Sequence, residues 1–308
     1  MRRTNLVLAF LPLLAATGRA DVTMRQSFNV TSAVVPQQVW DSLKHFVSFP
    51  VEVTTRVKGD RAYSSFGPMV SIMDMAKNQL TLLDTRNRKF ATVPIDKYIT
   101  GFTAAQPEMP PEAAKLLEAM QLDVKTRPTG RTETIQGVPT DESEITVTLD
   151  MPIPGQTVSM KMVLTLQIWR ASLEASQKVP AVREMLAYSA RTKKSMDPAA
   201  FMKQLFAKMP GFGDKISGPI EQLTNSTSML MKIRGQLTLP AMAAAMQPGA
   251  QPGAAPGPTA ELTMDVLALS SDPVPDALLQ VPEGYQSAPI EELTKSMMPA
   301  PPQPPAKK

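Results

Sequence analysis

The chain has 308 residues, no cysteine, one histidine and a formal net charge of +4. Without cysteine it has no thiol nucleophile, thiolate metal site or disulfide, and a single histidine excludes a histidine-rich zinc site. Methionine is abundant (21 residues) while aromatic residues make up 5%, so aliphatic and thioether side chains must build the core.

Residues 1–20 have the three parts of a secretory signal peptide. Two arginines are followed by an apolar run over 6–16, and the small residues Gly18 and Ala20 stand three and one before a cut after Ala20. The run is about half as long as a membrane span of roughly 20 residues, and without cysteine no lipid can be attached at the new N-terminus. We therefore expect a periplasmic or secreted protein that does not span a membrane.

Cleavage at this point also changes the charge of the protein. Loss of Arg2, Arg3 and Arg19 removes three positive charges and lowers the formal charge from +4 to +1. The remaining basic residues form no stripe and are not interleaved with aromatic residues. We expect no nucleic-acid partner.

Alternation of apolar and polar residues, the pattern of a strand with one buried face, dominates the mature chain. In its first third, short strands separated by turn signals such as Lys58-Gly59-Asp60 are predicted at 22–30, 51–57, 62–66, 70–74, 80–84 and 90–93. Because each strand has one polar face, the pattern favours an antiparallel, half-exposed sheet.

The clearest alternation runs from Thr157 to Trp169. Apolar residues fall on one face of this strand: Val158, Met160, Met162, Leu164, Leu166 and Ile168. A Pro154-Gly155 turn joins it to a strand over 145–151 as a hairpin. Two further strands follow, one with Met229, Met231 and Ile233 on a single face, and one over 262–268.

Helical periodicity is predicted at 36–47, at 111–120 and in a block over 179–223, where Phe201 and Leu205 belong to an apolar stripe. Residues 241–259 are of low complexity and are expected to form a disordered loop between two strands, and 299–308 form a Pro-rich tail. These elements predict a single domain over 21–298 of the α+β class.

Catalytic motifs are missing from the sequence, and we expect no enzyme, no cofactor and no metal. His45 has no acidic partner in a recognisable motif and is interpreted as a polar residue of the first helix. The pairs Met73/Met75, Met160/Met162 and Met229/Met231 each place two thioethers on one face of a strand, an arrangement that suits Cu(I). Their aliphatic neighbours favour the alternative, in which methionine fills the core.

Several short motifs, in this order, resemble a class of exported bacterial proteins of unknown function. They are Lys58-Gly59-Asp60-Arg61, Ile72-Met73-Asp74, Leu80 to Asp84, Lys89-Phe90, Gln136-Gly137-Val138-Pro139, Ile168-Trp169 and Val281 to Tyr285. That class is similar to the periplasmic lipoprotein-carrier (LolA/LppX-like) superfamily. The resemblance implies a curved antiparallel half-barrel, with helices packed over a concave face that holds acyl chains.

Two functions follow from this interpretation. The first is a non-enzymatic, carrier-like protein that binds a lipid, another hydrophobic ligand or a lipidated partner between sheet and helices. The residues expected to line that site are Val158, Met160, Met162, Leu164, Leu166, Ile168, Met229, Met231, Ile233, Phe201 and Leu205. The alternative is a structural or interaction module of the cell envelope with a fully packed core.

The signal peptide can be tested directly. We expect the exported protein to begin at Asp21, because the small residues before this position fit the cleavage site. N-terminal sequencing of the material from outside the cytoplasm measures the start. Finding Met1 there would contradict cleavage.

Overall fold

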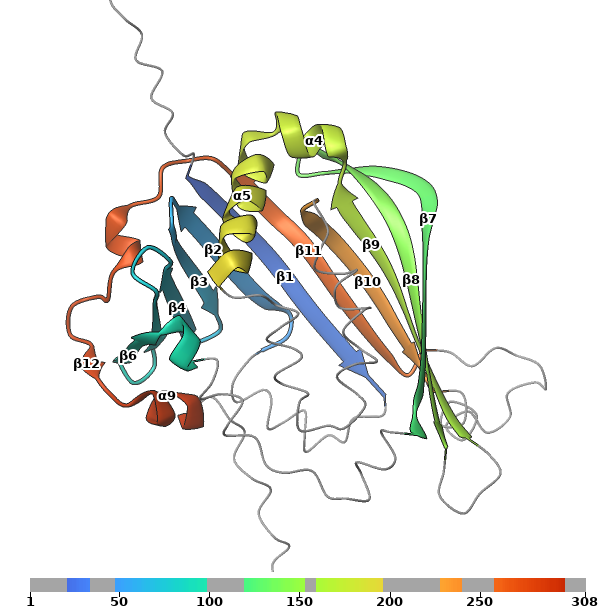
Figure 1. Ribbon diagram of the computed structural model, residues 1–308, viewed down its shortest axis with the longest axis horizontal. Helices are drawn as coiled ribbons and strands as arrows, with labels where there is room; N and C mark the ends of the chain where they lie inside the picture. The colour runs from blue at the N-terminus through green and yellow to red at the C-terminus, as the bar shows by residue number, and fades with distance from the viewer. Residues whose placement is uncertain are drawn as a thin grey trace, which may run out of the picture.

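The computed structural model describes residues 21–33, 48–98, 119–152, 159–195, 228–239 and 258–296. The described strands form one twelve-stranded sheet, in the order β12-β6-β5-β4-β3-β2-β1-β11-β10-β9-β8-β7 (Figure 1). They are β1 (Val22–Ser32), β2 (Val51–Lys58), β3 (Arg61–Phe66), β4 (Met69–Asp74), β5 (Gln79–Asp84), β6 (Lys89–Pro94), β7 (Gln121–Ile135), β8 (Val138–Pro152), β9 (Ser159–Ala171), β10 (Leu230–Thr238), β11 (Ala260–Ser270) and β12 (Gln286–Ser287). The helices described in full are α4 (Leu173–Lys178), α5 (Pro180–Ser195) and α9 (Ile290–Ser296), with a 3-10 turn η1 (Asp276–Leu279), and residues 95–98 after β6 are also helical.

Strand β1 lies in the middle of the sheet and joins its two halves. On one side it pairs with β2, and β3 to β6 follow as a meander. On the other side it pairs with β11, which is late in the chain. All of these neighbours are antiparallel, and only β12 pairs in parallel, with β6, among the described strands.

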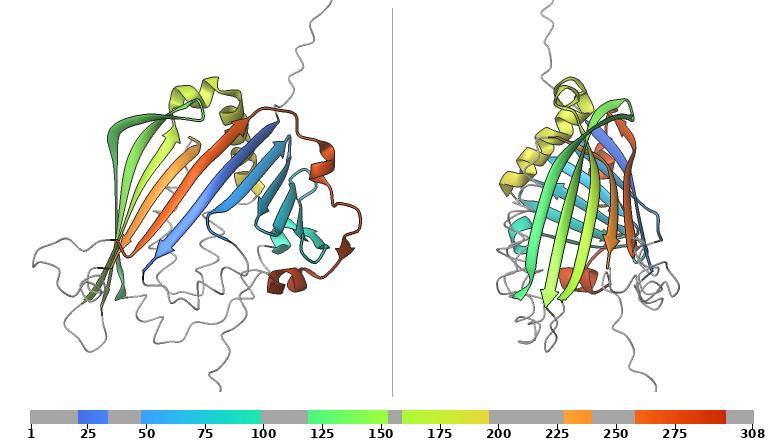
Figure 2. Two further views of the ribbon diagram at one scale, coloured as in Figure 1. Left: turned by 180° about the vertical axis from the view of Figure 1, so that it is seen from behind. Right: turned by 90° about the vertical axis from the view of Figure 1, so that its right-hand side faces the viewer.

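The expected strands are present, and the expected fold class is wrong. Those predicted before residue 100 have ends that differ by at most two residues from the observed ones, and the β8–β9 hairpin is confirmed. The described chain is, however, predominantly strand, and its longest helix has 16 residues. It is therefore not an α+β fold with helices packed over a concave face. The sheet is open between its edges, β7 and β12, so a half-barrel is not confirmed either (Figure 2).

Most of the helices that were expected to cover the sheet lie outside the described residues: these are 36–47, 111–118 and the part of the block over 179–223 that follows residue 195. In addition, the 15-residue strand β7 was not predicted. It contains Pro128 and Gly130 among charged and hydroxyl residues, and its pairing with β8 shifts register between Pro128 and Thr132. Proline is tolerated at a sheet edge because no second neighbour needs its missing N–H.

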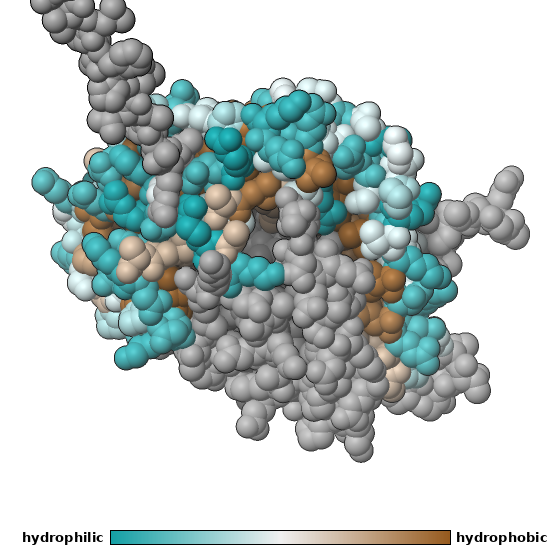
Figure 3. Space-filling model, turned by 45° about the horizontal axis from the view of Figure 1, so that its top comes forward, coloured by the Kyte–Doolittle hydropathy of each residue, from teal (hydrophilic) through white to brown (hydrophobic). Residues whose placement is uncertain are grey.

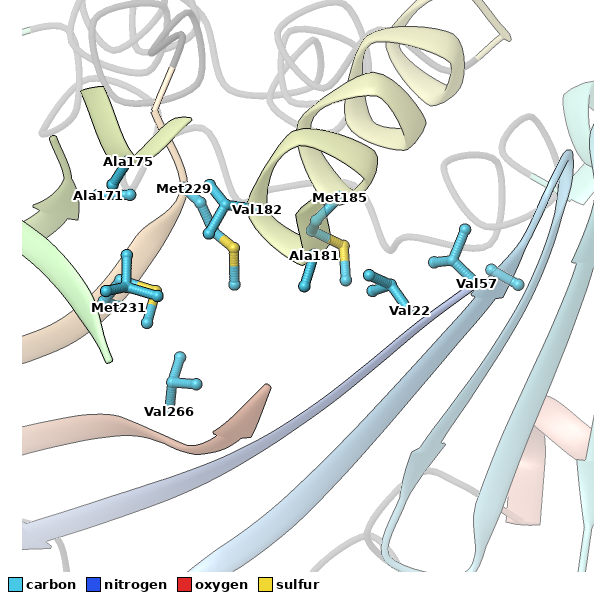
Figure 4. Close-up of a cluster of buried hydrophobic side chains, with 12 residues drawn as sticks. Val22, Val57, Ala171, Ala175, Ala181, Val182, Met185, Met229, Met231 and Val266 are labelled. Atoms are coloured by element: carbon cyan, nitrogen blue, oxygen red, sulfur yellow. The ribbon is translucent and has the colours of Figure 1, made fainter. Parts of the chain in front are cut away.

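Helix α5 packs on one face of the sheet at the ends of β1 and β2. Ala181, Val182 and Met185 of α5 belong to a buried cluster with Val22 and Val57, which are direct cross-strand partners. Figure 4 shows these side chains meeting between helix and sheet. The cluster is aliphatic and thioether in character, as the scarcity of aromatic residues requires.

The strands β4 to β6 are covered on both faces. Leu80 and Leu82 are buried on one face beside Leu293 of α9. Leu83 is buried on the other face, where Val281 and Tyr285 of the segment after η1 pack against it. Adjacent residues of β5 are therefore both apolar, in contrast to the one-sided alternation of the strands beyond β1.

The turn between β2 and β3 holds both α5 and η1. Arg191 of α5 donates to the carbonyl oxygen of Gly59 at 3.0 Å and to Glu184 at 2.9 Å, and its Nε lies 3.3 Å from an Asp60 oxygen. On the other side of the turn, Lys58 and Arg61 donate to Asp276 of η1 at 3.0 and 2.5 Å, which lowers the pKa of that carboxyl group. The Lys-Gly-Asp-Arg motif is thus a structural clamp.

Replacing Arg191 should loosen α5. Arg191→Met removes the hydrogen bonds to Gly59 and Glu184 and leaves a largely buried carboxylate without its partner. We expect the free energy of unfolding to fall by about 1.5–3 kcal/mol, measured by denaturant unfolding. The control Lys178→Met breaks an exposed, solvent-screened pair with Glu174 and should leave the free energy of unfolding nearly unchanged. Equal effects of the two substitutions would contradict the clamp.

Candidate functional site

Beyond α5, the same face of the sheet carries rows of apolar side chains across β7, β8, β9, β10, β11 and β1. Directly opposed residues of paired strands place their side chains on one face. The strand pairings define three rows: Leu122, Leu149 and Met162; Val124, Val147, Leu164 and Leu237; and Ile145, Leu166, Leu262 and Val30, with Gly235 of β10 between Leu166 and Leu262. A fourth row is Ile168, Ile233, Met264 and Phe28. We call these four rows the apolar strip.

The opposite face of these strands is polar. The row behind Leu164 consists of Lys125, Thr146, Thr165, Gln236, Glu261 and Thr31. Ion pairs join neighbouring strands there, for example Arg127 to Glu144 at 2.9 Å and Arg234 to Asp265 at 2.6 Å. Lys232 lies 4.5 Å from the centre of the Trp169 ring and 2.7 Å from Glu133. The two faces are therefore sharply different in polarity.

Much of the apolar strip remains partly exposed. Ile168 and Met264 are buried, whereas Leu164, Leu166 and Leu237 are only half-buried. On this side of the molecule, hydrophobic side chains lie along the upper border of a hollow (Figure 3). Half-exposed aliphatic residues in continuous rows give a surface on which an apolar molecule can lie.

The residues expected to line a ligand site divide into three groups. Met160, Met162, Leu164, Leu166 and Ile168 share one face of β9, and Ile233 lies directly opposite Ile168. The second group, Met229 and Met231, is buried in the cluster under α5. The third group, Val158, Phe201 and Leu205, lies outside the described residues.

The structure adds residues that sequence reasoning did not assign to the site. Val147 and Leu149 were predicted on an apolar face of their strand, but only the pairing shows that this face continues into Leu164 and Met162. Val30 and Phe28 of β1 belong to the apolar strip because β1 pairs with β11, a strand that is remote in sequence. Val124 was missed because its strand β7 was not predicted.

Arg170 is a basic residue on the face of the apolar strip, two positions after Ile168 on β9. Its Nη1 donates to the hydroxyl of Ser143 at 3.4 Å, and Ser143 is the cross-strand partner of Ile168. The side chain is half-buried, and burial lowers the pKa of the guanidinium group below its usual value. Asp141 of β8 is the direct cross-strand partner of Arg170, so its carboxylate lies on the same face. The end of the strip nearest α4 therefore carries one basic and one acidic residue side by side.

Of the three methionine pairs, Met73 and Met75 contact helix α5. The sulfur of Met73 accepts a hydrogen bond from the Tyr188 hydroxyl at 3.7 Å, and the sulfur of Met75 accepts one from Thr192 at 3.5 Å. These contacts attach α5 to β4 and to the turn that follows it. The described part of the chain contains no group of three or more histidine, aspartate or glutamate residues placed to hold a metal ion. His45 lies outside that part.

Among the helices that the structure describes, none has both the length and the apolarity needed to cross a membrane. Comparison with known proteins assigns no family, since no family model and no curated protein matches the chain. The resemblance to exported lipoprotein carriers therefore stays a prediction. The functional argument rests on the apolar strip and the groups around it.

Proposed function

We propose that this chain is an exported, non-enzymatic carrier that holds an acyl chain or another hydrophobic ligand, free or attached to a lipidated partner, against the apolar strip. The observation that carries the proposal is the continuity of partly exposed apolar rows over six strands, with a polar opposite face. Its place of action is the periplasm or the outside of the cell, as the signal peptide indicates.

The energetics of the strip suit such a ligand. Apolar surface removed from water contributes about 25 cal/mol per Å², so covering roughly 300 Å² contributes about 7 kcal/mol before the cost of immobilising the ligand. Leucine, valine and methionine side chains make contacts without direction and adapt to chains of different length. The surface therefore supports recognition of a chemical class and not of a single molecule.

The first test compares substitutions on the two faces of β9. Leu164 lies between Val147 and Leu237 on the apolar strip, whereas Thr165 lies between Thr146 and Gln236 on the polar face. Leu164→Lys places a charge in the path of the ligand and should weaken binding of a fluorescent fatty acid by about tenfold or more. Thr165→Lys is the matched control and should bind as the wild type does. Fluorescence titration gives both affinities.

The same titration distinguishes the carrier from an interaction module with a packed core. In the module, the wild type binds no probe, and Leu164→Lys unfolds the protein because it buries an unpaired charge. Val147→Thr, which keeps the side-chain shape, serves as a milder variant that should fold and still weaken binding several-fold, by about 1 kcal/mol or less. Absence of probe binding in the folded wild type would refute the carrier.

Native ligand provides a second test. We expect the protein, purified from the cell envelope without detergent, to release acyl lipid on extraction into organic solvent, and mass spectrometry identifies it. Leu164→Lys purified in parallel should release much less. Equal amounts from both proteins would show that the lipid is not held by the strip.

A further inference from the structure

Four uncharged polar side chains interrupt the apolar face in the middle of the sheet, on strands β1 to β4. Three of them form one cross-strand row that begins beside Met24 and ends beside Leu82. The fourth follows Met24 on the same face of β1 and is the neighbour of Phe28 of the apolar strip on that face. We call this group the neutral patch, and its members are Gln26, Thr55, Ser64 and Ser71.

The neutral patch lies between the two helices of this face and the apolar strip. In the neighbouring row, Val57 and Ala62 are buried in the cluster under α5, while Leu82 at the end of the patch row is buried beside α9. Charged residues that share this face, such as Asp84 of β5 and Arg170 of β9, lie nearer the edges of the sheet. The patch therefore offers hydrogen bonds without charge, next to the apolar strip.

The hydrogen-bonding capacity of the patch is only partly used. The hydroxyl groups of Thr55 and Ser64 lie 3.1 Å apart and bond to each other, and each can form further hydrogen bonds. Gln26 donates one of its two amide N–H groups to the sulfur of Met264 at 3.6 Å, and sulfur is a weak acceptor. All four side chains are half-buried, and the oxygen of Ser71 is not closed off from solvent. Polar groups in apolar surroundings gain from added hydrogen bonds, so the patch suits a ligand that carries hydroxyl groups.

We propose that the neutral patch binds the uncharged, hydroxyl-bearing head group of a lipid whose acyl chain lies along the apolar strip. The inference rests on the proposed carrier function and specifies the class of its ligand. Hydroxyl groups donate and accept hydrogen bonds, as do the hydroxyl and amide groups of the patch, so the two surfaces are complementary without an ion pair.

The order of groups along the sheet agrees with this assignment. From the apolar strip outward, Phe28 is followed by the Gln26 amide and then by the hydroxyl groups of β2, β3 and β4. The hydroxyl row from Thr55 to Ser71 crosses two strand spacings, about 10 Å in all, so two hydroxyl groups of one head group can bind at separate strands. Acyl chain, ester and hydroxyl groups follow one another in the same order in an acylglycerol.

The experiment compares monododecanoylglycerol with methyl dodecanoate, which has the same acyl chain and no hydroxyl group. Both displace a fluorescent probe from the full mature protein, and we expect the wild type to prefer monododecanoylglycerol by about tenfold or more. The double variant Thr55→Val with Ser64→Ala removes both partners of one hydrogen bond and leaves neither unpaired. It should lose most of the preference, while its affinity for methyl dodecanoate stays within about twofold of the wild type.

A matched control lies on the opposite face of the same sheet. The hydroxyl groups of Thr81 and Thr92 form the same kind of cross-strand pair, at 2.8 Å, on strands β5 and β6. Thr81→Val with Thr92→Val should therefore keep the preference of the wild type. Dodecyl glucoside, titrated alongside, distinguishes a sugar from glycerol as the source of the hydroxyl groups, according to which of the two ligands binds more tightly.

Each remaining outcome decides a separate point. Equal affinity of the wild type for the ester and the acylglycerol overturns the patch as a head-group site and leaves the carrier function standing, whereas binding of neither overturns both. Tighter binding of dodecanoate than of monododecanoylglycerol, or a preference that survives in the double variant, also overturns the site. Should that variant fail to fold, Ser71→Ala decides instead: a preference reduced several-fold supports the patch, and an unchanged preference refutes it.

Discussion

The pairing of β1 with β11 is the constraint on which the rest of the structure depends. It brings together residues 238 positions apart in the chain, such as Gln26 and Met264, and unites two meanders into one sheet. It also aligns the faces of the two halves, so that the cluster under α5 and the apolar strip lie on the same side. Because side chains alternate along a strand, a slip of one residue in this pairing would turn one half over relative to the other.

The strands and their facing were largely predictable, because alternation is a local signal. The odd and even residues of β9 divide as expected, with Leu164 and Thr165 on opposite faces. Acidic residues of the motifs that resemble exported bacterial proteins hold turns of the chain in shape. Asp84, for example, accepts hydrogen bonds from the backbone N–H groups of Arg86 and Asn87 and so shapes the β5–β6 turn.

The pairing order and the fold class were not predictable, for physical reasons. No local pattern shows that β1 pairs with β11, because that choice depends on the whole sheet. Strand β7 has too few apolar residues to show the alternation of a strand, and it contains Pro128. An edge strand tolerates such a sequence because it pairs with a neighbour on one side only. Met231, which was expected to line a ligand site, lies in the buried cluster under α5, and the pairing of β10 with β9 shifts register at this point, between Leu230 and Lys232.

Both edges of this sheet are poor templates for another strand. Strand β7 has Pro128, an irregular register and the exposed charges Lys125 and Arg127, while β12 at the other edge is only two residues long. Exposed edges with regular, uncharged backbone recruit further strands and lead to aggregation, and proline, charge, irregular register and short length each prevent this. A protein whose described strands carry a broad, partly exposed apolar face thus limits growth of the sheet at its ends.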